Sequence, residues 1–422
     1  MKGYIFILQL CLFAMSCMNS NQNEKAEQGH INTEKEKPTA TEHPVIAFLN
    51  ERDSTNNTGL PVVDLQKMYS FENVCLQDIA DVEYIVLETH DDALITTKRT
   101  IVTDSFIVTR RMEDAVFFKR DGRFSHVLNR KGGSGEEYTL LSHLCISPQN
   151  REVYIHDGLR GWIQVYTYNG EYKRTLKIKD QNFTLGEISY NGSEALFAED
   201  IMNVDYVDNK PTNPRPYYNI SVADGTKYRL PITLKKRIGN AFKMFDEKTG
   251  INTTIRVDLY PVSNINNELI ISNFALDTIY KYQDERLVPI ARKENWKKQN
   301  GVPNIVALDA MTEDFFLWHA VEKDFDNAFK GLLTRTILQN RHTGKCLLVN
   351  LVDSNIIDKR FRFPKRMTAN YHITPENTIL QYYPADVLKE LLELGKLQGK
   401  LKEIASKLDE EDNPVLVLAK FK

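Results

Sequence analysis

Eight side chains spread along this sequence could bind a metal ion or carry acid–base chemistry. Four are histidines on or beside strand-like segments, and the other four offer an oxygen ligand. Imidazole nitrogens suit zinc, whereas carboxylate and amide oxygens suit calcium. No HxH or HExxH spacing is present, so a metal site would need distant segments to converge. The candidates are Asp104, His143, His156, Asp157, Asn273, His319, His372 and Glu376.

Other catalytic patterns are missing from the sequence. It has no G-x-S-x-G nucleophile elbow. The glycine-rich stretch Gly132–Gly135 lacks the Gly-Lys-Ser/Thr ending of a phosphate loop and opens no helix. We interpret it as a close crossing between two strand units, with a ligand site at the same loop as the alternative. The net charge is −3 and the basic residues are scattered along the chain, which argues against nucleic-acid binding.

The elements that would position these residues follow from a recurring strand–turn–strand pattern. Its clearest turns are Asp121-Gly122, Asn169-Gly170 and Asp224-Gly225, with weaker copies at Asp284 and Gly344. Asn-Gly and Asp-Gly between alternating apolar strands are strong hairpin signals. The turns lie 48 to 60 residues apart, which suits a repeated four-stranded blade. The sequence therefore predicts an all-β propeller, and the eight candidates could approach its central channel.

The end of the chain predicts how the ring closes. Residues 375–383 and 413–421 are strand-like, but the chain stops at Lys422 without a final turn and outer strand. The segment VEYIVLE, residues 82–88, precedes the first repeat and has no partner of its own. Propellers avoid exposed edges by closing the ring. We therefore predict six blades, the sixth built from both ends of the chain.

One segment interrupts the β pattern within the last blade. Residues 385–408 carry leucines and isoleucines at three- and four-residue steps, which predicts an amphipathic helix. Pro384 suits its first turn, whereas Gly395 and Gly399 favour a break. We interpret this helical insertion as a cap packed on one face of the ring. A partner-binding or pocket-covering element is the alternative.

The N-terminus predicts export and anchoring. Residues 1–17 read as a short apolar signal that ends at Cys17, the expected lipidation site of a bacterial lipoprotein. Residues 18–60 are predicted to form a flexible tether, because 18–43 hold almost no apolar side chains. The propeller is assigned to residues 61–422.

Three segments together resemble a known family. They are residues 78–95, 117–138 and 153–172, and they resemble the six-bladed β-propeller lipoproteins of gut Bacteroidetes. The second blade is also similar to an NHL-type repeat, through Asp157, Arg160, Ile163, Val165 and Tyr166. The resemblance implies a fold and an envelope location, but no established activity.

The leading functional hypothesis is a membrane-tethered binding or scaffold module of the cell envelope, with its ligand unknown. The alternative is a metal-dependent lyase or hydrolase acting on sugars or lactones at the channel mouth, with calcium or zinc as cofactor. A sensor feeding a transport or signalling system is a third class. The expected partners are the membrane, through a lipid anchor, and an envelope protein or carbohydrate, but not nucleic acid. The expected location is the outer membrane, with the periplasmic side favoured over the cell surface.

Overall fold

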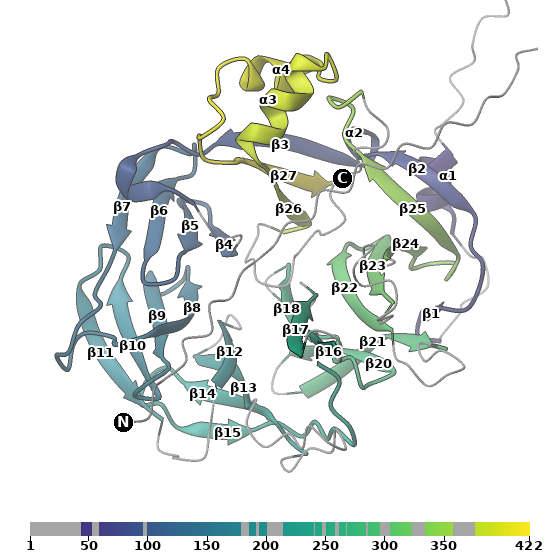
Figure 1. Cartoon of the computed structure of the whole chain (residues 1–422). Coiled ribbons are helices and arrows are strands. Elements are labelled where there is room, and N and C mark those ends of the chain that lie inside the picture. Colours follow the sequence, from purple (N-terminus) through teal and green to yellow (C-terminus); the bar gives the residue numbers. More distant parts are fainter. Residues whose placement is uncertain are drawn as a thin grey trace, which may run out of the picture. The chain divides into compact units, whose positions relative to one another are not determined.

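The repeats of the sequence form β-sheets that are arranged in a ring (Figure 1). The chain divides into a unit Met1–Glu42 and a unit His43–Lys422, and only residues of the second unit are described. This computed structural model describes residues 44–52, 59–95, 99–178, 185–190, 194–200, 214–239, 241–246, 250–257, 261–266, 268–283, 286–295, 304–322, 334–357 and 376–422.

Five blades each contain four consecutive antiparallel strands. Blade one holds β4 (Arg99–Val102), β5 (Phe106–Arg110), β6 (Ala115–Lys119) and β7 (Phe124–Leu128). Blade two holds β8 (Leu141–Ser147), β9 (Glu152–Asp157), β10 (Trp162–Thr167) and β11 (Tyr172–Lys177). Blade three holds β12 (Leu185–Tyr190), β13 (Ala195–Asp200), β14 (Tyr217–Ser221) and β15 (Lys227–Arg229).

Blades four and five follow the same plan. Blade four holds β18 (Val262–Ile265), β19 (Glu268–Ile271), β20 (Thr278–Gln283) and β21 (Arg286–Glu294). Blade five holds β22 (Ile305–Met311), β23 (Phe315–Val321), β24 (Thr334–Asn340) and β25 (Cys346–Val352). Between blades three and four, β16 (Ala241–Asp246) and β17 (Ile251–Arg256) form a two-stranded sheet of their own.

Blade six joins the two ends of the folded unit, as the sequence predicted. Its described strands are β26 (Thr378–Tyr383), β27 (Val415–Phe421) and β3 (Ala80–Val86), in that order across the sheet. β27 pairs with β3 in antiparallel register over all seven residues of each strand. The six-bladed propeller with closure by both chain ends is therefore confirmed.

The chain between residues 62 and 86 runs along the outer edges of three successive blades, and we call it the N-terminal belt. β1 (Val62–Asp64) adds a parallel fifth strand to blade four, beside β21. β2 (Phe71–Cys75) does the same for blade five, beside β25. The short helix α2 (Leu76–Ile79) then leads into β3. The belt therefore supplies an outermost strand to blades four, five and six.

The prediction of a flexible tether over residues 18–60 is wrong for residues 44–50. Residues 44–50 form the helix α1, and its Val45 and Phe48 are buried in the main hydrophobic cluster. Asn340 Nδ2 donates a hydrogen bond of 2.7 Å to the Phe48 carbonyl oxygen, which fixes the helix to blade five. The folded unit thus begins before residue 60.

The helical insertion is present and broken where the glycines predicted. α3 (Ala385–Glu393) and α4 (Gly399–Ala405) are separated by Gly395, which has a φ of 64°. Leu388 and Leu401 are completely buried in the same cluster as the closing strands. The predicted packing of the apolar face is confirmed. None of the helices in the described residues is long and apolar enough to cross a membrane.

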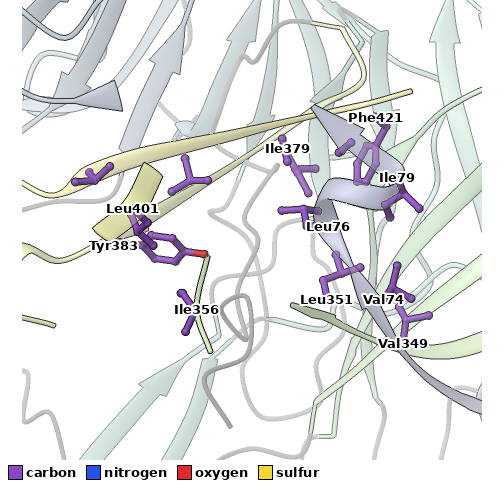
Figure 2. Packing of buried hydrophobic residues seen from close by; sticks show 14 of the residues in the cluster. Val74, Leu76, Ile79, Val349, Leu351, Ile356, Ile379, Tyr383, Leu401 and Phe421 are labelled. Atoms are coloured by element: carbon purple, nitrogen blue, oxygen red, sulfur yellow. The ribbon is translucent and has the colours of Figure 1, made fainter. Parts of the chain in front are cut away.

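A hydrophobic cluster surrounds the closure of the ring. Figure 2 shows Val74 of β2, Leu76 of α2, Leu351 of β25, Leu401 of α4 and Phe421 of β27 in this cluster. Each comes from a different element, and two come from the N-terminal belt. Burying these side chains together is what holds the belt, the last two blades and the insertion in one core.

A buried carboxylate at the end of β25 fastens the same closure. Asp353 is only 2% exposed and accepts hydrogen bonds of 2.7 Å from the Tyr84 hydroxyl and from Gln77 Nε2. It also accepts from the Tyr383 hydroxyl at 3.1 Å and from the Asn355 backbone at 2.9 Å. Burial raises the pKa of both tyrosines, and the nearby carboxylate adds to the effect, so both hydroxyls remain donors. Asp353 therefore links α2, β3, β25 and β26.

Candidate functional site

A surface groove lies on blade six between α4 and the chain that leaves β3. Its volume is about 410 Å³. Apolar side chains form its floor and charged side chains form its rim. The lining residues are Val86, Leu87, Glu88, Thr89, Lys400, Glu403, Ile404, Lys407, Leu408 and Asp412. We call it the helix groove.

Hydrogen bonds between the two chain ends hold the walls of the helix groove in place. The Thr89 hydroxyl donates to Asp412 Oδ1 at 2.7 Å, and the Asn413 backbone donates to Thr89 Oγ1 at 3.0 Å. Asn413 Nδ2 donates to the Glu88 carbonyl oxygen at 2.9 Å. Val86 stays 39% exposed at the groove. A preformed apolar floor with a charged rim is suited to recognition, and its lining contains no cysteine, histidine or serine.

A second hollow of about 400 Å³ lies along β3, between blades six and one. It is lined by Asp81, Val82, Glu83, Asp104, Arg120, Thr378, Leu418 and Lys420. Arg120 is already held by Glu83, through a bidentate pair at 3.1 and 2.7 Å. Asp104 therefore lies at a hollow in the surface, in the turn between β4 and β5.

Asp157 serves the glycine-rich loop. It is fully buried and accepts hydrogen bonds from the Thr139 hydroxyl at 2.6 Å and the Thr139 backbone at 2.8 Å. Burial raises the pKa of Asp157, but these hydrogen bonds outweigh it and hold the pKa below its usual value. Arg160 donates to the carbonyl oxygens of Gly133, Ser134 and Glu137 at 2.7 to 2.8 Å. Asp157 and Arg160 therefore fix the loop that crosses from blade one to blade two. This agrees with the structural interpretation of the glycine-rich stretch.

His143 and His156 are the two candidates that contact each other. They are opposite one another on β8 and β9, and their rings stack with centroids 5.8 Å apart. His156 is only 5% exposed. The pair is part of the packing within blade two.

Asn273 and His319 lie in buried polar surroundings of blades four and five. Asn273 Nδ2 donates to the Tyr217 hydroxyl at 2.5 Å, and its carbonyl oxygen accepts from Lys293 Nζ at 3.0 Å. His319 Nδ1 lies 3.5 Å from Asp309 Oδ2. Burial raises the pKa of Asp309 well above its usual value.

The remaining candidates do not add to a site. Glu376 is exposed just before β26, and its carbonyl oxygen accepts from the Thr378 hydroxyl at 3.0 Å. His372 and Cys17 lie outside the described residues. Within the described ranges, no three His, Cys, Asp or Glu side chains are grouped so that they could hold a metal ion. The calcium or zinc site in the channel stays a prediction.

Sequence reasoning missed several buried ionisable residues, among them Asp309, Lys293 and Asp353. Asp309 stands in an otherwise apolar strand, and an acid in such a run was a usable signal. Lys293 lies among other basic residues, and Asp353 follows an apolar strand like many turn acids. Nothing in their sequence context separates them from surface charges.

Comparison with known proteins places the fold among related chains. A family model described as "Domain of unknown function (DUF4934)" matches residues 60–420. The curated proteins contain no match. A solved structure from Bacteroides fragilis NCTC 9343, described as an exported protein, is similar with a TM-score of 0.56 and 12% identity, covering 86% of this chain and 99% of that one. A DUF4221 member from Bacteroides vulgatus ATCC 8482 has a TM-score of 0.47 and 10% identity, covering 82% and 98%.

The buried Lys293 should make stability depend on pH. Burial lowers its pKa from 10.5 to about 7, and the Asp277 carboxylate offsets only part of this effect. Between these two pKa values the unfolded chain binds more protons, so stability rises as the pH is raised from 7 to 10. The difference of about 3.5 between these two pKa values corresponds to roughly 5 kcal/mol.

We therefore expect Lys293→Met to be more stable than the wild type at pH 7, with the gap closing by pH 10. Urea unfolding of both proteins across this range measures it, and the tyrosines and cysteines titrate equally in both. A gap that stays constant with pH would show that the buried amine does not titrate as stated.

Proposed function

This chain belongs to the DUF4934 family, and we propose that it is a membrane-tethered binding module of the cell envelope. The helix groove is the observation that carries the proposal. Its lining is suited to holding a partner segment, whereas the buried Asp157 and Asn273 are engaged in structural hydrogen bonds. The groove on the described surface therefore supports a binding role without catalysis.

The partner of the helix groove is a protein segment with an apolar side chain next to charged ones. The floor of Leu87, Ile404 and Leu408 would take the apolar side chain, and Lys400 and Lys407 would face acidic groups on the partner. Among the strands that the structure describes, β3 is the outermost of its sheet and has a neighbour on one side. Blades four and five accept an added parallel strand at the same position. An extended segment could therefore pair with β3 and reach the groove beyond Val86.

The proposal of a tether is supported by the sequence. Cys17 would carry the lipid, and the chain up to about residue 43 would link it to the folded unit, which starts with α1. We propose the outer membrane as the location, on its periplasmic side. The likeness of blade two to an NHL-type repeat also stays a proposal, supported by Asp157 and Arg160, whose charged groups lie 3.9 Å apart.

Removal of the lipid site tests the tether. We expect Cys17→Ser to move the protein from the membrane fraction to the soluble periplasmic fraction, because stable anchoring by acyl chains needs that thiol. Fractionation of cells followed by immunoblotting measures the shift. Cys75→Ser is the matched control and should leave the protein with the membrane. Equal membrane recovery of Cys17→Ser and the wild type would contradict the anchor.

Photocrosslinking tests the helix groove. We expect a photoreactive residue at Val86 to give a discrete adduct in intact cells, and the charge reversals Lys400→Glu and Lys407→Glu to remove it. Val288 is the matched control, because it is 41% exposed, close to the 39% of Val86. The same adduct pattern from both positions would exclude the groove as the docking site, as would an adduct that survives both reversals.

A further inference from the structure

Four exposed apolar side chains lie on turns at one end of the ring, and we call them the apolar arc. They are Leu94, Met112, Leu140 and Leu159. Met112 and Leu159 project furthest, at 79% and 74% exposed, while Leu94 and Leu140 are 45% and 42% exposed. Each of these turns either leads towards the first strand of blade one or two or joins the second strand to the third. Antiparallel pairing places these connections at the same end of a blade.

Hydrogen bonds hold the first two turns of the apolar arc together. Arg111 Nη1 donates to the Asp92 carbonyl oxygen at 2.8 Å, and the same guanidinium pairs with Asp114 at 2.6 and 2.7 Å. Met112 follows Arg111 directly, and Leu94 comes two positions after Asp92. The turn between β5 and β6 therefore holds Met112 beside the turn that carries Leu94.

The loop between blades one and two continues the apolar arc. The Tyr138 hydroxyl donates to the Glu113 carbonyl oxygen at 2.8 Å, which fixes this loop to the turn between β5 and β6. The Gly158 backbone donates to the Leu140 carbonyl oxygen at 3.0 Å, and a Cβ on Gly158 would lie 3.5 Å from Leu140 Cδ2. Leu159 is the next residue. The four apolar side chains therefore belong to one connected surface.

Turn chemistry does not account for the apolar arc. Tight turns favour glycine, proline, asparagine, aspartate and serine. The first turns at the opposite end of blades one and two are polar, because residues 103–105 are TDS and residues 148–151 are PQNR. Exposed side chains such as Met112 and Leu159 forgo the stabilisation that burial gives. Apolar side chains gathered on one surface mark an interaction site, whereas isolated ones do not.

The apolar arc has an acidic end, next to blade six. Residues 88–95 and 409–414 contain seven Asp or Glu and no Lys or Arg. Asn413 joins the two segments, because its Nδ2 donates to the Ala93 carbonyl oxygen at 2.9 Å. Among the described residues, the only ion-pair partner of these acids is a histidine, His90. Ion pairs with Lys or Arg therefore do not cancel the negative potential of this end.

The chain enters the folded unit away from the apolar arc. α1 lies at blade five, across the ring from blade two (Figure 1). Directly after α1, Glu51 pairs with Lys345 at 2.6 Å and Arg52 pairs with Asp314 at 2.7 Å. Asp314 belongs to the turn between the first two strands of blade five, at the end of the ring opposite the arc. The arc is thus not covered by α1.

We propose that the apolar arc and its acidic end dock a protein that presents apolar side chains beside Lys or Arg. The inference rests on the binding role proposed above and adds the kind of partner. Charge selects this occupant, because an anionic lipid surface or a second copy of the same surface would meet like charge. Apolar side chains with adjacent cations on another protein would instead be complementary.

Photocrosslinking of the full-length protein in intact cells is the first test. A benzophenone side chain replaces Met112 or Leu159, and Met68, which is 91% exposed on the N-terminal belt, is the control position. We expect both arc positions to give an adduct with the same protein, and Met68 to give none with it. The crosslinked peptide of that protein should contain Lys or Arg next to apolar residues.

Titration with the purified partner is the second test. Met112→Ser with Leu159→Ser should weaken binding at least tenfold, because the apolar contact is lost. Glu410→Lys with Glu411→Lys should weaken it at least fivefold, and both of these acids are exposed. Added salt should weaken binding of the wild type, because exposed charges are screened.

Two matched variants separate this surface from general effects of hydrophobicity and charge. Met68→Ser with Tyr228→Ser removes two exposed apolar side chains outside the arc. Asp104→Lys with Glu171→Lys reverses two exposed charges on the turns between β4 and β5 and between β10 and β11. Each variant should change the affinity less than twofold.

Several outcomes would overturn the proposal. It is wrong if neither arc position gives an adduct, if the crosslinked peptide lacks Lys and Arg, or if the matched variants lose as much affinity as the arc variants. Binding to phosphatidylethanolamine and phosphatidylglycerol vesicles, or self-association in sedimentation, that requires Met112 and Leu159 would assign the surface to lipid or to a second copy. Val86→Glu should leave both arc adducts in place, so failure here and failure of the helix groove are separate results.

Discussion

The structure depends on the pairing of the last strand with a strand from the start of the folded unit. A ring of blades has no open end only if its last sheet is completed, and here β27 receives β3 over seven residue pairs. Asp353 fastens the junction through donors on three elements. Losing this buried acceptor would leave the hydroxyls of Tyr84 and Tyr383 without it, at a cost of about 1 to 3 kcal/mol for each unsatisfied group.

The path of the N-terminal belt follows from this closure and decides which surfaces remain open. To reach blade six, the chain passes along the outer edges of blades four and five and pairs with both. Among the described strands, blades one, two and three have no such added strand. The helix groove forms where the belt leaves β3 beside the helical insertion. Residues 78–95, around this end of the belt, contain six acids and no Lys or Arg.

Much of the fold could be predicted from local sequence signals. The Asp-Gly and Asn-Gly turns require positive φ, and Gly122 and Gly170 adopt it at 90° and 81°. At Gly122 a Cβ would also lie 2.1 Å from the Val86 carbonyl oxygen, so glycine allows the close approach of blade one to the closing strand. The unpaired strand before the first repeat and the incomplete last repeat together predicted how the ring closes. The pairing of β1 and β2 in the N-terminal belt was missed, because parallel pairing of three-residue and five-residue strands with distant edges leaves no local pattern.

In contrast to the fold, little about the candidate site residues could be predicted from the sequence. Asp157 and Asn273 were chosen for their chemistry, yet their partners are structural groups brought close only by the fold. Side-chain type thus indicates what a residue can do, and only the packing of blades determines which residues act together.

A cysteine pair across β3 and β27 tests the closure most directly. Asp81 and Lys420 are register partners and both are exposed. Opposed residues of an antiparallel pair have Cα atoms about 4.5 to 5.5 Å apart, which suits a disulfide. We expect Asp81→Cys with Lys420→Cys to form an intramolecular disulfide under mild oxidation of the folded protein and to raise its melting temperature, whereas Asp81→Cys with Lys402→Cys forms none. Two free thiols in the oxidised, folded first pair would contradict the closure of the ring by the two ends of the chain.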